Sequence, residues 1–238
     1  MEILAIIPAR KGSKRVPKKN IKDFLGKPLI AYTVEQAKAH PGISRVIVDT
    51  DSQEIADVAK KYGAEVPFLR PEHLAQDDSK VIDSILYSIN RLKEEQDYQP
   101  DYIMILQTTS PLRELQDITN CINLIKQGDA TSVLTVCSTH PRLYNLTPDN
   151  YTVLVNGSEN SASSNTQDWP KAYIINGAFV YLIETKALIE EKNVITKKNK
   201  AIICSKWRSI DVDTPEEWMM AEVLYKNKDY IYEGLEKF

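Results

Sequence analysis

Ile3 to Asn20 reads ILAIIPARKGSKRVPKKN and joins an apolar run to a strongly cationic loop. The run Ile3–Ile7 has the uninterrupted hydrophobicity of a strand that is buried on both faces. After Pro8, six cations follow within ten residues of a chain whose formal net charge is -3: Arg10, Lys11, Lys14, Arg15, Lys18 and Lys19. Cations at the carboxyl end of a buried strand are typical of an anion site in an open α/β sheet. Gly12 would let the backbone approach a phosphate, and neighbouring N–H groups would form a concave nest for it.

Two other interpretations of the cationic loop have to be weighed. Six cations also suit a solvated loop or a nucleic-acid patch. The abrupt start after a buried strand disfavours the first, and the sequence pI of about 5.7 disfavours the second. The loop is not a Walker A motif, which needs a second glycine followed by lysine and serine or threonine. We therefore favour a phosphate site and expect no nucleic-acid partner.

The composition is that of an ordinary globular protein. With 238 residues, of which 42% are hydrophobic and 26% charged, the chain suits a single domain over residues 1–238. No apolar run approaches the roughly 20 residues that a membrane span needs, and the N-terminus lacks the positive region of a signal peptide. Cys121, Cys137 and Cys204 are widely spaced and form no C-x-x-C pair. We expect a cytoplasmic protein with reduced cysteines and no membrane partner.

Apolar runs alternate with helical periodicity along the first half of the chain. Strands are predicted over residues 3–7, 45–49, 64–68, 101–107 and 131–137, and helices over residues 28–38, 53–62, 77–95 and 115–127. This alternation predicts an α/β fold with a mostly parallel, Rossmann-like doubly wound sheet. Because parallel strands end at one edge, the basic loop, residues 49–52 and residues 107–113 are expected to meet there.

The hydrophobic content of the sequence falls at the start of the second half. Residues 140–170 lose hydrophobicity, and we expect an arm or flap that projects from the core, with residues 151–155 as one strand of a hairpin before Asn156-Gly157. Strands are predicted over residues 173–182 and 201–204, and an extended segment over residues 209–213. Thr214-Pro215-Glu216-Glu217 predicts a capping box that starts a C-terminal helix.

Asp211 and Asp213 form the most informative acidic pair. In an extended segment, residues two apart point to the same side, so both carboxylates would face one site. Such a pair suits magnesium when phosphates supply the other ligands. The alternative is that Asp213 stabilises the following helix terminus while Asp211 is solvated. Together with a phosphate loop, the pair suggests nucleotidyl transfer.

Five segments in order resemble the acylneuraminate cytidylyltransferases, or CMP-sialic acid synthetases. They are Ile7 to Asn20, Arg70 to Ala75, Leu106 to Arg113, Tyr173 with Asn176-Gly177-Ala178, and Ile210 to Glu216. The resemblance covers essentially the whole chain and implies a sheet of the nucleotide-diphospho-sugar transferase type. The related CMP-Kdo synthetases share Pro8-Ala9-Arg10, but Lys19-Asn20 favours the sialic acid branch.

The resemblance implies transfer of CMP from CTP to the anomeric hydroxyl of a nine-carbon 2-keto sugar acid, with release of pyrophosphate. The residues that would bind CTP are Arg10, Ser13, Lys14, Lys19, Asn20, Arg70 and Ser79, the last two at the cytosine and ribose. Those that would line the sugar-acid pocket are Gln107, Ser110, Tyr173 and Asn176. Asp211 and Asp213 would hold Mg²⁺. Catalysis would depend on Arg10, Lys19 and Asp211, the last by accepting the hydroxyl proton.

The chain departs from the family pattern in the half that would recognise the sugar acid. Thr108 stands where the family commonly has proline, residues 165–168 lack the expected arginine, and Arg142 follows Pro141 where a lysine is often found. N-acetylneuraminate, legionaminic acid and pseudaminic acid all stay open as substrates. The family also implies a homodimer in which the arm of residues 140–170 reaches the partner's site. A CMP-Kdo-like enzyme and a non-catalytic CTP-binding module are the alternatives.

Overall fold

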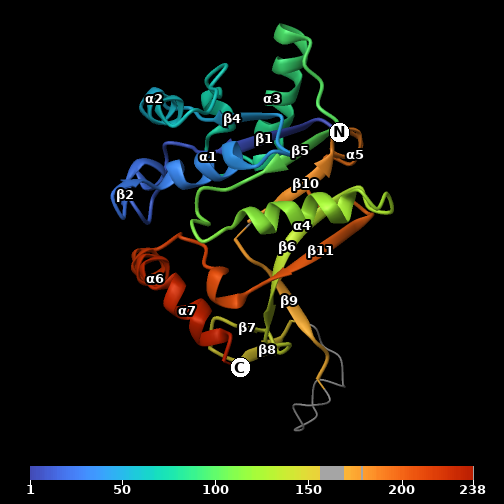
Figure 1. Cartoon of the computed structure of the whole chain (residues 1–238). Coiled ribbons are helices and arrows are strands. Elements are labelled where there is room, and N and C mark those ends of the chain that lie inside the picture. The colour runs from blue at the N-terminus through green and yellow to red at the C-terminus, as the bar shows by residue number, and fades with distance from the viewer. Residues whose placement is uncertain (156–168, 178, 238) are drawn as a thin grey trace.

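A computed structural model describes residues 1–155, 169–177 and 179–237 of the chain and places seven strands in one central sheet (Figure 1). The strands lie in the order β11 (Asn199–Cys204), β6 (Ser132–Thr139), β10 (Tyr181–Glu184), β5 (Tyr102–Ile105), β1 (Ile3–Pro8) and β4 (Arg45–Asp49), and β9 (Ala172–Ile175) pairs with β6. β1 runs parallel to β4 and β5, and β11 runs parallel to β6. The predicted α/β fold with a mostly parallel sheet is therefore confirmed.

β9 and β10 are the antiparallel strands of this sheet. Both pair with β6, and β10 also pairs with β5. They divide the single strand that the sequence predicts over residues 173–182, with an interruption between Ile175 and Tyr181. The interruption contains Gly177, whose φ of +64° takes the backbone out of the extended conformation. The prediction of one strand there is wrong for this reason.

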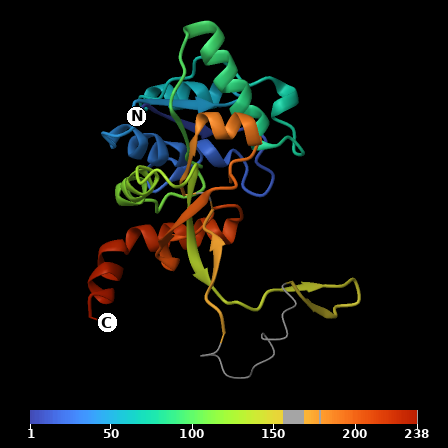
Figure 2. The same cartoon turned by 90° about the vertical axis from the view of Figure 1, so that its right-hand side faces the viewer.

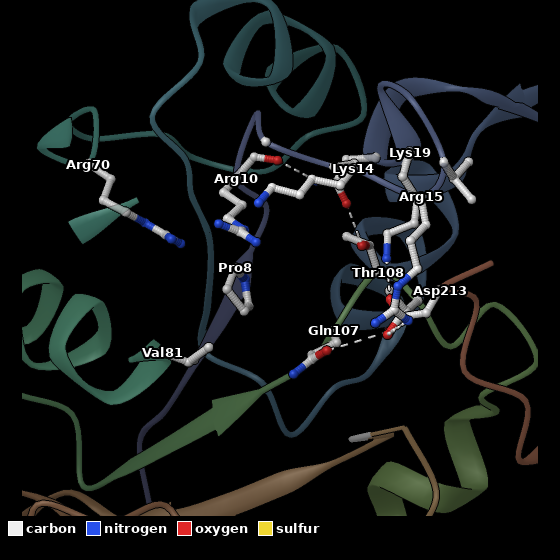
Figure 3. A pocket seen from close by; sticks show the side chains of 15 residues that line it. Pro8, Arg10, Lys14, Arg15, Lys19, Arg70, Val81, Gln107, Thr108 and Asp213 are labelled. Atoms are coloured by element: carbon white, nitrogen blue, oxygen red, sulfur yellow. Dashed lines mark hydrogen bonds and ion pairs between the residues drawn. The ribbon is translucent and has the colours of Figure 1, made fainter. Parts of the chain in front are cut away.

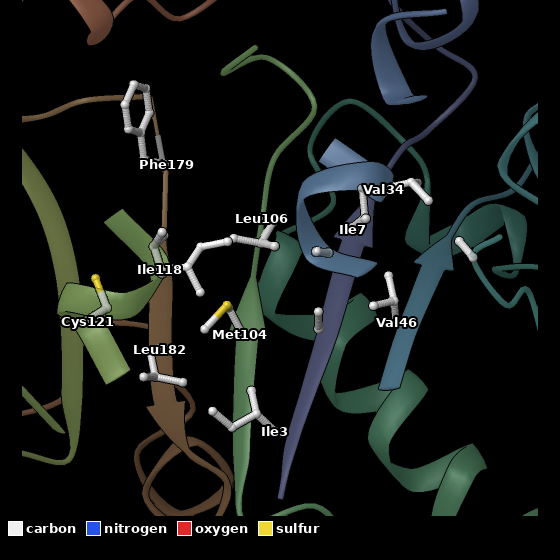
Figure 4. Packing of buried hydrophobic residues seen from close by; sticks show 14 of the residues in the cluster. Ile3, Ile7, Val34, Val46, Met104, Leu106, Ile118, Cys121, Phe179 and Leu182 are labelled. Atoms are coloured by element: carbon white, nitrogen blue, oxygen red, sulfur yellow. The ribbon is translucent and has the colours of Figure 1, made fainter. Parts of the chain in front are cut away.

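Helices cover both faces of the sheet. α1 (Leu29–Ala39), α2 (Gln53–Lys61) and α4 (Leu115–Ile125) pack on one face, and α3 (Val81–Gln96) and α5 (Thr185–Glu191) pack on the other. Side chains of β1 alternate between these two layers: Ile3 and Ile7 lie in the first (Figure 4), and Leu4 and Ile6 lie in the second. The opening apolar run is thus a strand buried on both faces, as predicted.

Several strands and helices begin or end at residues other than those predicted. Residues 64–68 form no strand but a single bridge between Ile47 and Glu65, because Pro67 lacks the N–H that a ladder needs. Pro28 ends the short hairpin of β2 (Asp23–Phe24) and β3 (Lys27–Pro28), so α1 begins one residue later than expected. Residues 77–80 precede α3 instead of opening it.

The C-terminal part contains the predicted capping box. Thr214 Oγ1 accepts a hydrogen bond from Glu217 N at 3.2 Å, with Pro215 at the first position of α6 (Pro215–Lys226), and α7 (Lys228–Leu235) follows. The segment before it is not a strand, since Asp213 N donates to Asp211 O at 3.0 Å and bends the chain at Val212. The prediction that residues 209–213 are extended is therefore wrong at Val212, where the chain turns.

A hairpin of β7 (Tyr144–Leu146) and β8 (Thr152–Leu154) stands away from the sheet (Figure 2). The strand predicted at residues 151–155 is confirmed, but its partner precedes it and the turn lies in residues 147–150. The turn expected at Asn156-Gly157 lies outside the described residues, as do residues 165–168. Among the residues that the structure describes, no helix combines the length and apolar character needed to cross a bilayer.

Candidate active site

A cavity of about 340 Å³ opens at the carboxyl end of β1, beside the carboxyl end of β5 (Figure 3). Its lining comes from segments far apart in the sequence. These residues are Pro8, Arg10, Gly12, Ser13, Lys14, Arg15, Val16, Lys19, Asn20, Arg70, Val81, Gln107, Thr108, Thr109 and Asp213. Cations therefore dominate the charge of the cavity, as the sequence predicts for this edge of the sheet.

Two carboxylates form ion pairs with cations of the loop. Asp77 Oδ1 lies 2.9 Å from Arg10 Nη1, and its other oxygen pairs with Lys14. The hydrogen bond from Lys14 is the main cause that lowers the pKa of Asp77. Asp213 Oδ1 lies 2.6 Å from Lys19 Nζ, and Asp213 Oδ2 lies 4.0 Å from Arg15 Nη1. The acidic segment and the cationic loop thus meet in one cavity.

The backbone of the loop is fixed by hydrogen bonds. Lys11 N donates to Asp51 Oδ1 at 2.8 Å, and Ser13 N donates to Lys11 O at 2.9 Å. These two N–H groups are therefore engaged within the protein, and the predicted nest of free N–H groups is wrong for Lys11 and Ser13. Gly12 lines the cavity, and a Cβ there would meet only Arg10 Nη1, at 4.0 Å. The loop consequently presents its side chains to the cavity more than its amides.

A small apolar cluster explains why Asp213 lies beside Lys19, although 194 positions separate them. Val16 of the loop packs with Val212, which lies between the two aspartates, and Trp218 of α6 packs on Phe24 with ring centroids 5.4 Å apart. These side chains are almost completely buried. Burial of this cluster holds the acidic segment against the basic loop.

Asp211 lies next to Gly177 rather than in the lining of the cavity. Its Oδ1 is buried and has no hydrogen-bond partner among the described residues. Burial raises the pKa of Asp211, and a hydrogen bond from the Thr109 side chain opposes that rise. An unsatisfied carboxylate oxygen is an available ligand for a hard cation, because burial without a partner is costly. Asp211 therefore supplies one oxygen donor of the type that a hard cation takes.

Arg70 lies at the other end of the cavity from Asp213 (Figure 3). Its Nε donates to Asp49 Oδ1 at 2.9 Å, and its Nη2 donates to Asp49 Oδ2 at 2.6 Å. Both side chains are buried, at 5% and 1% exposure. The paired aspartate fixes the guanidinium, so Arg70 has one orientation toward the cavity.

The structure brings most of the predicted nucleotide residues together. Of the residues predicted to bind CTP, the cavity is lined by Arg10, Ser13, Lys14, Lys19, Asn20 and Arg70, and it is also lined by Gln107 and Asp213. Ser79 lies outside this lining and donates to His73 O at 3.0 Å. Ser110 and Asn176 also lie outside it and are buried, and Tyr173 is exposed on β9. Of the four predicted sugar-acid residues, only Gln107 lines the cavity.

Some residues of the site had no signal in the sequence. The sequence pattern places Asp77 at the start of a helix, and only the fold shows that it pairs with Arg10 and Lys14. The close approach of Gly177 to Asp211 also depends on tertiary structure, although a glycine inside an apolar strand pattern already indicates an interruption.

Comparison with known proteins identifies the family of this chain. A family model described as cytidylyltransferase matches residues 4–237. The chain is 34% identical to the CMP-N,N'-diacetyllegionaminic acid synthase of Legionella pneumophila, over 94% of this chain and 96% of that protein. It is 33% identical to a pseudaminic acid cytidylyltransferase of Campylobacter jejuni, over 95% and 97%. It is 29% identical to the N-acylneuraminate cytidylyltransferase of Escherichia coli, over 96% of this chain and 53% of that protein.

Solved structures share the fold at low sequence identity. CMP:2-keto-3-deoxy-manno-octonic acid synthetase complexed with CTP superposes with a TM-score of 0.71 at 15% identity, over 96% of this chain and 100% of that one. A 4-diphosphocytidyl-2C-methyl-D-erythritol synthase from Anaerococcus prevotii gives a TM-score of 0.65 at 15% identity, over 94% and 98%. The family match over nearly the whole chain confirms the resemblance seen in the motifs: the protein belongs to the cytidylyltransferase family.

Proposed function

We propose that the protein transfers CMP from CTP to the anomeric hydroxyl of a nine-carbon 2-keto sugar acid and releases pyrophosphate. The observation that carries the proposal is the contact of 2.6 Å between Lys19 Nζ and Asp213 Oδ1 inside the cavity. It joins the cationic loop to Asp213, and nucleotidyl transfer needs cations and a metal-binding carboxylate on one triphosphate.

The cations of the loop would bind the triphosphate. Arg10 and Lys14 pair with Asp77, and bound phosphates would replace that carboxylate as their partner. Lys19, with its side chain only 13% exposed, would lie close to the transferred phosphorus, because it contacts Asp213. Arg70, fixed by Asp49, would contact the nucleoside. Positive charge in this partly buried site stabilises the charge that develops during transfer.

In the reaction, the anomeric hydroxyl oxygen forms a bond to the α-phosphorus of CTP. The bond from that phosphorus to the bridging oxygen breaks, and its electrons leave with pyrophosphate. Asp211, whose pKa is raised by burial, would accept the hydroxyl proton on a carboxylate oxygen. Magnesium held by Asp211 and Asp213 would supply neutralisation of phosphate charge. Positioning and electrostatics then account for catalysis without a protein nucleophile.

The acceptor is proposed to be a nonulosonic acid of the sialic type. Support comes from the names of the relatives, which specify N,N'-diacetyllegionaminic acid, pseudaminic acid and N-acylneuraminate. The cysteines that the structure describes are buried and free, which supports a location in the reducing cytoplasm.

A release assay tests this proposal. The protein is incubated with CTP, MgCl₂ and separate acceptors, namely N-acetylneuraminate, legionaminate, pseudaminate and Kdo, and pyrophosphate is measured. Release with a nonulosonic acid supports the proposal, and release with Kdo alone would reassign the acceptor to the CMP-Kdo type. CTP binding by calorimetry without release for any acceptor would favour a non-catalytic CTP-binding module.

Replacing Asp213 with asparagine is expected to weaken the dependence on magnesium. The amide keeps the shape but loses the charge that binds a hard cation, so the MgCl₂ concentration for half-maximal rate should rise at least about tenfold. Glu216→Gln is the matched control, because Glu216 is an exposed acid in the first turn of α6 and should leave the titration unchanged. An unchanged titration for Asp213→Asn would remove this residue from the metal site.

A homodimer is the proposed assembly, with the hairpin of β7 and β8 as part of the interface. Support comes from large apolar side chains that are exposed there and on β9, namely Tyr144, Leu146, Val153, Ile174 and Ile175. Light scattering is expected to give the mass of two chains, and Leu146→Asp is expected to shift that mass toward one chain. A single-chain mass for the unaltered protein at assay concentration would refute the dimer.

A further inference from the structure

The buried Thr108 hydroxyl begins a short series of hydrogen bonds that reaches the basic loop. Its Oγ1 donates to Asn20 Oδ1 at 2.6 Å, and Asn20 Nδ2 donates to Arg10 O at 2.9 Å (Figure 3). Thr108 is 2% exposed and Asn20 is 6% exposed. Both ends of the Asn20 carboxamide are therefore satisfied inside the protein, and its orientation is set by the hydroxyl on one side and the carbonyl on the other.

Asn20 also helps to position Lys19, which is a second cation of the loop. It belongs to the 3₁₀ turn η1 (Lys19–Ile21), so an anchored Asn20 holds the backbone from which Lys19 reaches Asp213. The N-terminal flank of this turn, Lys18, has a left-handed φ of 52°, which is strained for lysine. A strained turn needs contacts that hold it, and the buried bond from Thr108 is one of them.

The neighbouring threonine connects the same segment to the acidic side. Thr109 O accepts a hydrogen bond from Val212 N at 2.8 Å, and Val212 lies between Asp211 and Asp213. Thr108 and Thr109 thus tie the cationic loop and the acidic segment to one turn that follows β5.

We propose that Thr108 is a positioning residue for nucleotide binding, acting through Asn20 on Arg10 and Lys19. The inference rests on the proposed function, since it assigns Arg10 and Lys19 to the triphosphate. Proline, which the resembled motif commonly has at this position, carries no hydroxyl and could not donate this bond.

Calorimetric titration of CTP into the full-length protein without acceptor, together with steady-state kinetics, tests the inference. Thr108→Val removes the hydroxyl at nearly constant shape, and Thr108→Ser retains it. Thr135→Val is the matched control, because Thr135 is a buried threonine of β6 whose Oγ1 accepts from Val180 N at 3.2 Å away from the cavity. If Thr108→Val fails to fold, Thr108→Ala serves in its place.

Thr108→Val is expected to weaken CTP binding about tenfold, which corresponds to about 1.4 kcal/mol, while KM for the sugar acid changes little. Thr108→Ser should recover CTP affinity to within about threefold, and Thr135→Val should bind CTP as the unaltered protein does. In an Arg10→Ala background the effect of Thr108→Val should shrink, because coupled residues are not additive.

Wild-type CTP affinity in Thr108→Val would refute the role of Thr108. An equal loss in Thr108→Ser would also refute it, because the methyl group rather than the hydroxyl would then be responsible. If the unaltered protein binds no CTP at all, the proposed function fails and the inference fails with it. If it binds CTP but transfers no CMP, the binding measurements still decide the role of Thr108.

Discussion

Replacing Gly177 with alanine is expected to lower kcat about 100-fold. A Cβ on Gly177 would lie 2.7 Å from Asp211 Cβ and 2.9 Å from Asp211 Cγ, closer than such atoms approach one another. Asp211 would have to move away from the position in which it is proposed to bind magnesium and accept the proton. A displacement of about 1 Å in a catalytic group is enough for a loss of this size. The measurement is pyrophosphate release at saturating CTP and acceptor.

Gly128→Ala is the control that separates the effect of this close contact from the effect of backbone strain. Both glycines have a positive φ, +64° at Gly177 and +81° at Gly128, but nothing lies within 4 Å of a Cβ at Gly128. Each substitution should therefore cost about 1–2 kcal/mol of stability, measured by denaturant unfolding, through the left-handed backbone. Only Gly177→Ala should also lose turnover. Equal kcat values for the two variants would show that Asp211 does not need its present position.

Replacing Arg10 with alanine is expected to lower kcat by a factor of about 10² to 10³. Arg10 lies in the cavity beside Lys14, and its guanidinium faces Asp77 at 2.9 Å in the position where the triphosphate is proposed to bind. Removal of one fixed donor aimed at developing charge has an effect of this magnitude. The values of kcat and KM for CTP should be measured separately, because a transition-state role lowers kcat itself.

Arg45→Ala is the control for loss of an arginine. Arg45 lies at the amino end of β4, the opposite end of the strand from Asp49, and pairs with Glu65 at 2.6 Å. Its removal should leave kcat and KM unchanged. If Arg10→Ala raises KM and leaves kcat intact, Arg10 binds CTP equally in the ground state and the transition state, and its proposed catalytic role is refuted.

Local sequence patterns predicted the structure correctly where the stabilising features lie within one segment of the chain. The run Ile3–Ile7 has to be buried on both faces, so a central strand follows from its composition. Thr214 to Glu217 form the predicted capping box, because its bonds connect near neighbours. The strand predicted at residues 64–68 does not form, because Pro67 has no N–H for a ladder hydrogen bond even though apolar residues surround it.

The sequence by itself thus determined the mostly parallel α/β fold, the cationic loop at the end of the first strand and membership of the cytidylyltransferase family. Only the tertiary structure decided which of the side chains at this site pair with one another. Asp77 pairs with Arg10, Asp213 pairs with Lys19, and Thr108 holds Asn20. The physical reason is that periodicity and capping report contacts between near neighbours, whereas these pairs depend on how buried surfaces bring distant segments together.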